Sequence, residues 1–185
     1  MVLLDATTLL PLLSDDVPAP PDPKTNQPIE RVKERIDYLV AQLEKNKEKI
    51  IIPTPVLSEI LVRVGKAGPE YLERLSTSAP FRIVPFDTRA AVEVAAMTKR
   101  AMDRGDKRDG SDDVWAKIKH DRQIVAIAKI EGVTTIYSDD KHVRTLAVEA
   151  KIAVVSIAEL PLPPEDTQGE LPLDMPDTVE SESDS

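Results

Sequence analysis

The alternation of short apolar runs with longer helical patterns constrains the fold of this chain most. Five runs of strand length stand at residues 1–5, 50–53, 81–86, 133–138 and 152–156. Segments with the period of amphipathic helices separate them. The runs are apolar throughout rather than alternating, which is typical of strands covered on both faces. We therefore predict an α/β sandwich with a mostly parallel central sheet.

The charge of the chain is unevenly distributed. The formal net charge is −9, from 33 acids and 24 bases. Residues 165–185 hold eight of the acids and no Lys or Arg, so the remaining 25 acids face 24 bases in a nearly neutral body. The overall acidity therefore says little about nucleic-acid binding. Because residues 165–185 are rich in Pro, Ser and acids, we expect a disordered tail there and one domain over residues 1–164.

Residues 14–48 form a predicted insertion. Residues 14–28 are rich in proline and should form a surface loop, and residues 29–49 have the pattern of a long amphipathic helix. One face of this helix carries five apolar side chains: Val32, Ile36, Leu39, Val40 and Leu43. Two interpretations stay open, in which this face packs on its own domain or contacts a partner, such as the second chain of a homodimer.

Several classes of protein are excluded by composition and motifs. There is no cysteine, so disulfides, thiolate metal sites and a cysteine nucleophile are excluded. Two histidines are too few for a histidine-rich metal site. No G-x-G-x-x-G or P-loop motif occurs. No apolar run reaches membrane-spanning length, and the first residues lack a basic signal region, so we expect a soluble, cytoplasmic protein with no membrane contact.

Acidic residues follow or flank the predicted strands. Asp5 ends the first run, Asp139 and Asp140 follow the run 133–138, and Glu59 lies one turn into the helix after residues 50–53. The carboxyl ends of parallel strands meet at one edge, where α/β folds bind ligands. Asp121 stands out for a different reason, its position on a helix. It lies in the middle of an apolar helical stripe that we expect to pack the helix: Val114, Ile118, Ile124, Val125 and Ala128.

Each acid also has a simpler interpretation. Asp5 and Asp139 could serve merely as helix caps, and Glu59 could merely face solvent. Asp121 could form a structural salt bridge, because an unpaired buried carboxylate costs several kcal/mol. Carboxylates that converge in one pocket repel each other unless a divalent cation neutralises them. Oxygen ligands select Mg²⁺ or Mn²⁺. Such a site indicates phosphoryl chemistry, in which the metal activates water and neutralises phosphate charge.

Four segments, in order, resemble those of the PIN-domain nucleases: "LLDATTLL", "TPVLSEIL", "KHDRQIVAIAK" and "TTIYSDDKHV". The resemblance extends from Val2 to about Leu160. It implies a three-layer α/β/α sandwich with a mostly parallel sheet and a metal-dependent ribonuclease activity. Many members are toxins of toxin–antitoxin pairs, and others process or degrade RNA. RNA is then the substrate, and an antitoxin or other protein inhibitor is the implied partner.

The resemblance also implies roles for individual residues. Four acids become catalytic residues and ligands of Mg²⁺ or Mn²⁺: Asp5, Glu59, Asp121 and Asp140. Thr7 and Ser138 take supporting hydroxyl positions, and Asp139 either assists or replaces Asp140. The chain departs from the family at His142 and Val143, where many members have an acid followed by an aromatic residue.

Other interpretations of the same residues stay open. The chain could be a non-catalytic binding or scaffold protein that keeps its acids as a cation or salt-bridge site, or a PIN-like nuclease that acts in RNA processing or on DNA. An aspartyl-phosphate phosphatase needs a second acid two residues after Asp5, where this chain has Thr7. Bases and acids interleave between Lys99 and Arg122, so no nucleic-acid surface is assigned. We expect Trp115, the single tryptophan, to pack in the core.

Overall fold

A computed structural model of the chain describes residues 1–14, 17–22 and 24–164. The predicted disordered tail at residues 165–185 lies outside the described residues. Within the described ranges, no helix is long and apolar enough to cross a membrane.

A five-stranded parallel sheet forms the centre of the fold. Its order is β3-β2-β1-β4-β5. The strands are β1 (Val2–Leu4), β2 (Ile50–Pro53), β3 (Phe81–Val84), β4 (Thr135–Tyr137) and β5 (Ala153–Val155). Val2 of β1 pairs with Ile50 on one side and with Thr135 on the other. Every residue of β1 and β2 is buried, as their uninterrupted apolar sequences predict.

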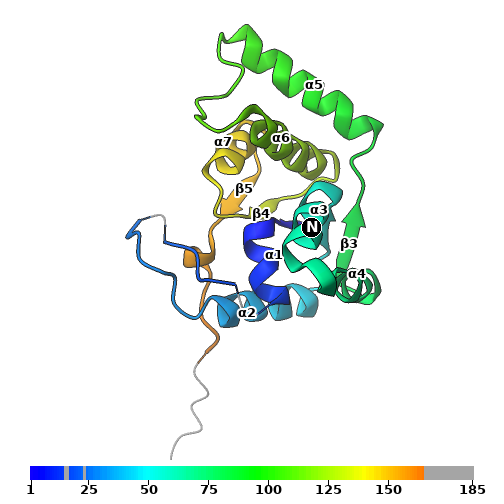
Figure 1. The fold of residues 1–185 in the computed structure, drawn as a ribbon, viewed down its shortest axis with the longest axis vertical. Helices are drawn as coiled ribbons and strands as arrows, with labels where there is room; N and C mark the ends of the chain where they lie inside the picture. Colours follow the sequence, from blue (N-terminus) through cyan, green and yellow to red (C-terminus); the bar gives the residue numbers. More distant parts are fainter. Residues whose placement is uncertain (15–16, 23, 165–185) are drawn as a thin grey trace, which may run out of the picture.

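Helices connect consecutive strands. They are α1 (Ala6–Leu13), α2 (Val32–Lys45), α3 (Thr54–Val64), α4 (Gly68–Thr77), α5 (Thr88–Asp103), α6 (Trp115–Ile130) and α7 (Lys141–Glu149), with short 3-10 helices η1 (Gly65–Ala67) and η2 (Ile157–Glu159). From β1 the sheet grows outward through β2 to β3 on one side and through β4 to β5 on the other. Right-handed crossovers in these two directions place helices on both faces. Figure 1 shows α5, α6 and α7 grouped together, with α1 near the centre and α2 toward the opposite end. The predicted α/β sandwich is confirmed.

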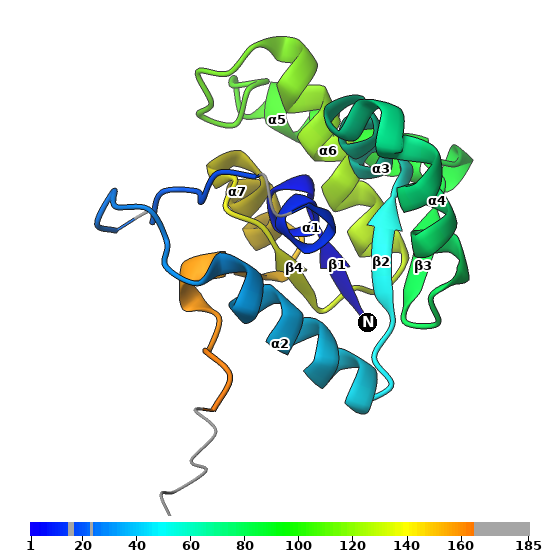
Figure 2. The same cartoon turned by 60° about the horizontal axis from the view of Figure 1, so that its bottom comes forward.

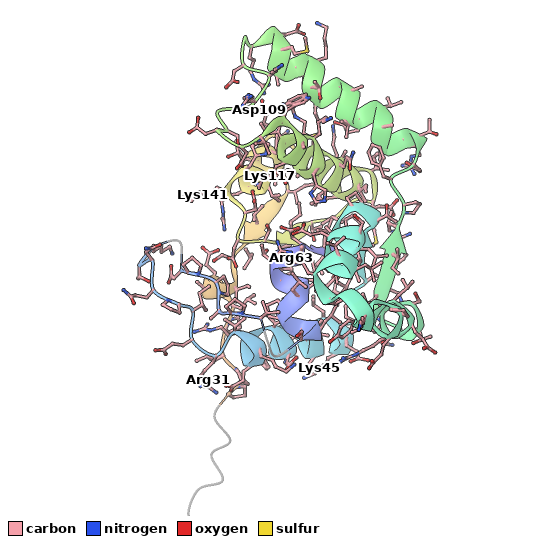
Figure 3. The ribbon with its side chains drawn as sticks, viewed as in Figure 1. Arg31, Lys45, Arg63, Asp109, Lys117 and Lys141 are labelled. Atoms are coloured by element: carbon pink, nitrogen blue, oxygen red, sulfur yellow. The ribbon has the colours of Figure 1, made fainter. Side chains whose placement is uncertain are left out.

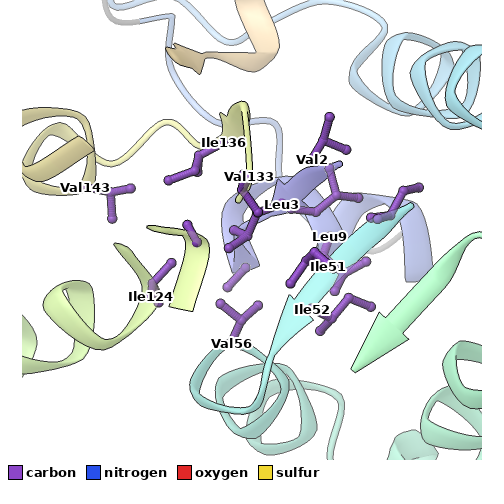
Figure 4. Packing of buried hydrophobic residues seen from close by; sticks show 14 of the residues in the cluster. Val2, Leu3, Leu9, Ile51, Ile52, Val56, Ile124, Val133, Ile136 and Val143 are labelled. Carbon is purple, nitrogen blue, oxygen red and sulfur yellow. The ribbon is translucent and has the colours of Figure 1, made fainter. Parts of the chain in front are cut away.

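The core lies between the sheet and its helices. Leu3 of β1 and Ile52 of β2 are fully buried and pack with Val56 of α3, Ile124 of α6 and Val143 of α7 (Figure 4). Burying a side chain of this size contributes about 1.5 to 3 kcal/mol. The core therefore fixes α3, α6 and α7 against the sheet, and these helices begin at or run past its carboxyl-terminal edge.

Helix α2 packs on its own domain. Ile36, Leu39 and Leu43 are buried, and α2 contacts α1 and η2. Figure 2 shows α2 lengthwise and α1 nearly end-on, so the two helices cross. Arg35 also donates a hydrogen bond from Nη1 to the carbonyl oxygen of Leu160. The apolar face of the insertion thus meets the chain's own core, which favours the first of the two interpretations. A homodimer stays a prediction without support from this helix face.

A buried arginine holds the segment between α5 and α6. Arg122 has no exposed surface, and its Nη2 donates to the carbonyl oxygen of Lys107 and to Oδ2 of Asp109, both at 2.6 Å. Its Nη1 donates to Oγ1 of Thr98 at 3.1 Å. Residues 104–114 form turns and bends without a helix or strand. Arg122 therefore ties this segment to the body of the protein.

Two sequence predictions about the start of α6 were wrong. Val114 is 70% exposed because α6 begins at Trp115 and Val114 is its extended N-cap residue. Trp115 is half-buried outside the core: its ring lies 5.2 Å from Nζ of Lys107 and 5.4 Å from Cζ of Arg122. A cation over an aromatic face is attractive, so Trp115 supports the 104–114 segment instead. The other members of the stripe, Ile118, Ile124, Val125 and Ala128, are buried as predicted.

Replacing Arg122 with Met should lower the free energy of unfolding by about 3 kcal/mol, because a buried ion pair loses one partner. The 104–114 segment should also become the first site of limited proteolysis. Chemical denaturation and mass spectrometry of the fragments measure both effects. Lys99→Met removes the exposed Lys99–Asp103 pair and should cost less than about 1 kcal/mol. Equal stability of the two variants would contradict an anchoring role for Arg122.

Candidate active site

The four predicted acids come to one edge of the sheet from four elements. Asp5 follows β1 and caps α1, and Asp140 follows β4 and caps α7. Glu59 lies on α3 and Asp121 on α6. The charges of Glu59 and Asp140 both act on Asp5. Helix capping and convergence are therefore both present, and the capping interpretation does not exclude a site.

Asp5 is buried, and both of its carboxylate oxygens accept hydrogen bonds. Its Oδ1 accepts a hydrogen bond from the amide of Ala6 at 2.7 Å, and its Oδ2 accepts one from the hydroxyl of Ser138 at 2.6 Å. Burial raises the pKa of Asp5 to about 6; the two hydrogen bonds oppose this, while the charges of Glu59 and Asp140 add to it. The like charges nearby disfavour ionisation of Asp5, which a cation would favour.

Asp121 is buried and already paired. Its Oδ2 lies 2.8 Å from Nδ1 of His142 and 3.2 Å from Nζ of Lys117. Nδ1 of His120 lies 3.9 Å from its Oδ1. Burial alone would raise the pKa of Asp121, but the two histidines and Lys117 hold it well below its ordinary value. Asp121 therefore carries a negative charge inside the apolar face of α6.

Asp140 and Asp139 point to different places. Oδ1 of Asp140 accepts hydrogen bonds from the amides of His142 and Val143, at 2.8 and 3.1 Å, which caps α7. Its Oδ2 lies 2.7 Å from Nζ of Lys117. Asp139 instead accepts a hydrogen bond from the amide of Ile157, and burial raises its pKa. Of the two residues, Asp140 is the one that lies in the acidic cluster.

The two predicted supporting hydroxyls differ in what they contact. Ser138 is buried, donates to Asp5, and accepts a hydrogen bond from the amide of Asp140 at 3.1 Å. It therefore links two of the acids directly. Oγ1 of Thr7 accepts from the amide of Asp139 at 3.3 Å, so it supports the turn after β4 rather than the carboxylate of Asp5.

Glu59 lies at the rim of the cluster. Its side chain is one-third exposed and pairs with Arg63, one turn further along α3, at 2.8 Å. Its charge still acts on Asp5 and on His120. Glu59 therefore faces solvent and contacts only Arg63 among charged side chains in the described residues, as the simpler interpretation predicts. Its negative charge nevertheless acts on the site through Asp5.

Lys117 is the site residue that sequence reasoning missed. Its Nζ lies 2.7 Å from Asp140, 3.2 Å from Asp121 and 3.2 Å from Asp113. Figure 3 labels Lys117 on α6. Burial would lower its pKa, but these carboxylates raise it strongly. The four-residue spacing of Lys117 and Asp121 puts both on one face of α6, and Asp113 lies just before the helix; this spacing was the available signal.

The donor chemistry of the cluster fits a hard divalent cation. Carboxylate oxygens from several elements are the ligands that Mg²⁺ and Mn²⁺ prefer, and Asp5 lies among like charges. As the side chains stand, no group of three or more acids or histidines within the described ranges lies close enough to hold a metal ion. The cation between Asp121 and Asp140 is the ammonium of Lys117. A divalent cation would need Lys117 to move.

The pairing of Asp121 changes how its role must be tested. The sequence presented a salt bridge and a metal site as alternatives, and a metal ligand was expected to be removable without loss of stability. The structure shows buried Asp121 paired with the partly exposed ammonium of Lys117 and in hydrogen-bond contact with the ring of buried His142. Asp121→Asn should therefore destabilise the metal-free fold whether or not Asp121 binds metal, so stability alone does not separate the two roles.

The raised pKa of Asp5 should give the metal-free protein a specific pH dependence. A carboxyl group with a higher pKa in the folded state stabilises the fold below its unfolded pKa of 3.8, and this contribution is lost as pH rises through about 6. Relative to Asp5→Asn, the wild type should therefore lose about 3 kcal/mol of unfolding free energy between about pH 4 and pH 7. Denaturation in the presence of a chelator measures it. The exposed Asp37→Asn variant should follow the wild type, and parallel curves for wild type and Asp5→Asn would contradict the assignment.

By sequence the chain matches no known protein family and no curated protein. Comparison with solved structures finds similarity to VapBC2 from Rickettsia felis bound to a DNA fragment from their promoter, with a TM-score of 0.53 and 13% identity over 84% of this chain and 98% of that chain. DNA-bound VapBC from Salmonella typhimurium has a TM-score of 0.52 and 14% identity over 84% of this chain and 97% of that chain. These are PIN-domain structures. The fold of this chain is therefore the three-layer α/β/α fold of PIN domains.

Proposed function

We propose that this chain is a divalent-metal-dependent endoribonuclease that hydrolyses RNA phosphodiester bonds. The observation that carries the proposal is the convergence of Asp5, Asp121 and Asp140 at one edge of the sheet, with Glu59 at its rim. Two of these acids are buried, and Ser138 joins Asp5 to Asp140. Converging carboxylates are a poor surface for RNA unless a cation neutralises them, and this favours a metal-dependent reaction over simple binding.

The protein's own contribution is to hold the carboxylates in fixed directions. The cap of α7 fixes Asp140, the hydroxyl of Ser138 orients Asp5, and the ring of His142 orients Asp121. Asp5, Asp121 and Asp140, with Glu59, would hold Mg²⁺ or Mn²⁺. The bound cation would supply neutralisation of phosphate charge and activation of water. Pre-fixed ligands reduce the reorganisation that such a reaction requires.

We further propose that a protein inhibitor partners this nuclease in the cytoplasm, as the antitoxin of a toxin–antitoxin pair. The support is the resemblance of the acidic segments to PIN-domain toxins and the shared fold with VapBC structures. The gene adjacent to this one is the place to look for such a partner. Co-expression followed by purification of the complex would test the pairing.

One observation favours a second candidate, a non-catalytic binding protein with the same fold. Lys117 already neutralises part of the cluster, so Asp121 and Asp140 can persist without a metal. In that case the acids would serve stability alone. The two candidates differ in whether the chain cleaves nucleic acid at all, and the following experiment separates them.

The protein should cleave RNAs from a pool of structured and single-stranded molecules, and only when Mg²⁺ or Mn²⁺ is present. Single-stranded DNA tested in parallel should stay intact. Asp5→Asn should reduce the cleavage rate at least about 100-fold, the size of effect that loss of one charge-stabilising group has in other active sites. This variant keeps a good helix N-cap, so its fold should persist. Gel analysis of labelled substrates measures the rates.

The exposed Asp37→Asn variant removes the same charge from α2 and should cleave like the wild type. Cleavage that persists in chelator, or equal rates for wild type and Asp5→Asn, would contradict the proposed site. Cleavage of DNA alone would move the substrate assignment from RNA to DNA.

A further inference from the structure

The ammonium of Lys117 lies between carboxylates from separate segments. Asp140 follows β4, Asp121 lies one turn after Lys117 on α6, and Asp113 precedes that helix. Their Oδ2 atoms are 2.7, 3.2 and 3.2 Å from Nζ, in that order. Lys117 is the third residue of α6, and the amino-terminal end of a helix disfavours a positive charge. The carboxylates therefore stabilise Lys117 there, against the helix dipole.

We propose that Lys117 is a tethered counter-ion that occupies the acidic cluster in the metal-free protein and that a divalent cation must displace to bind. The inference rests on the proposed metal-dependent function and assigns Lys117 control over metal affinity at that site. Lys117 is then a positioning residue that acts through Asp121 and Asp140, with no contact to the reacting atoms.

The surroundings of Lys117 allow this exchange. Its side chain is 38% exposed, so the ammonium has a path to solvent, and Asp113 beside it is 42% exposed. Asp113 precedes α6, and its Oδ2 lies 3.2 Å from Nζ of Lys117. When the ammonium leaves Asp121 and Asp140, it can therefore keep one carboxylate partner at the rim.

The remaining partners of the two acids stay in place during such an exchange. Asp121 keeps the ring of buried His142, and Asp140 keeps the amides at the start of α7. Only the bond to Lys117 has to break. A divalent ion brings twice the charge of the ammonium to the same carboxylates, so it can compete where a monovalent ion cannot.

Two consequences follow for metal binding. Removal of the Lys117 charge leaves the acids more strongly negative and ends the competition, so Mn²⁺ should bind Lys117→Met at least about tenfold more tightly than the wild type. In chelator, the same variant should melt at a lower temperature than the wild type because Asp121 and Asp140 lose their counter-ion. Mn²⁺ should then raise its melting temperature by more than it raises that of the wild type.

Isothermal titration of the full chain with Mn²⁺ and thermal unfolding with Mn²⁺ or chelator test the inference. Lys119→Met is the matched control because Lys119 is an exposed lysine on the same helix, two residues away. It should bind Mn²⁺ within about twofold of the wild type, since an exposed charge is screened. Lys117→Arg keeps the positive charge and should stay close to the wild type. Asp5→Asn should lose most of the binding.

The outcomes distinguish this inference from the proposed function. Equal Mn²⁺ affinity of Lys117→Met and wild type, with metal-dependent cleavage intact, overturns the role of Lys117 alone. Weaker binding by Lys117→Met, or equal gains for Lys117→Met and Lys119→Met, overturns it as well. If neither the wild type nor Lys117→Met binds Mn²⁺, the metal site and the counter-ion role both fall.

Discussion

Several carboxylates lie at one edge of the sheet, and the local structure must offset the repulsion among them. All five strands are parallel, so the residues that follow them emerge on the same side. Asp5 and Asp140 come from neighbouring strands, and α3 and α6 bring Glu59 and Asp121 to the same edge. Each charge raises the cost of ionising the others. Hydrogen bonds, capped helices and one lysine offset this cost.

The supports around the acids come from elements whose first task is folding. The side chain of Asp140 accepts hydrogen bonds from the amides at the start of α7, and this contact both caps the helix and fixes the carboxylate. Ser138 directly follows β4 and donates a hydrogen bond to Asp5, which directly follows β1, so the pairing of these two strands also sets the distance between the acids. The same residues therefore serve both the fold and the site, and a loss of the pairing between β1 and β4 would separate Asp5 from Asp140.

Patterns that depend on burial could be predicted from the sequence, and contacts between side chains could not. The apolar runs gave β1 and β2 because a strand covered on both faces needs no polar residue. Asp121 stood out because it breaks such a pattern. The start of α6 was missed because it depends on the extended backbone of Val114, and hydrophobicity does not report backbone angles. Lys117 was missed because its shortest ion pair is with Asp140, which is distant in sequence.

The two buried acids reach opposite solutions to the same electrostatic problem. The pKa of Asp5 is raised to about 6, so near that pH the group spends half its time protonated, whereas Asp121 stays ionised against Lys117 and the histidines. The metal-free site thus holds less negative charge than its number of carboxylates suggests. Below about pH 6, binding of a divalent cation would have to remove a proton from Asp5 as well as the ammonium of Lys117 from Asp121; above that pH, only the ammonium has to leave. Metal affinity at this edge should therefore depend on pH through Asp5 and on the freedom of one lysine, two terms that act on different carboxylates of the same cluster.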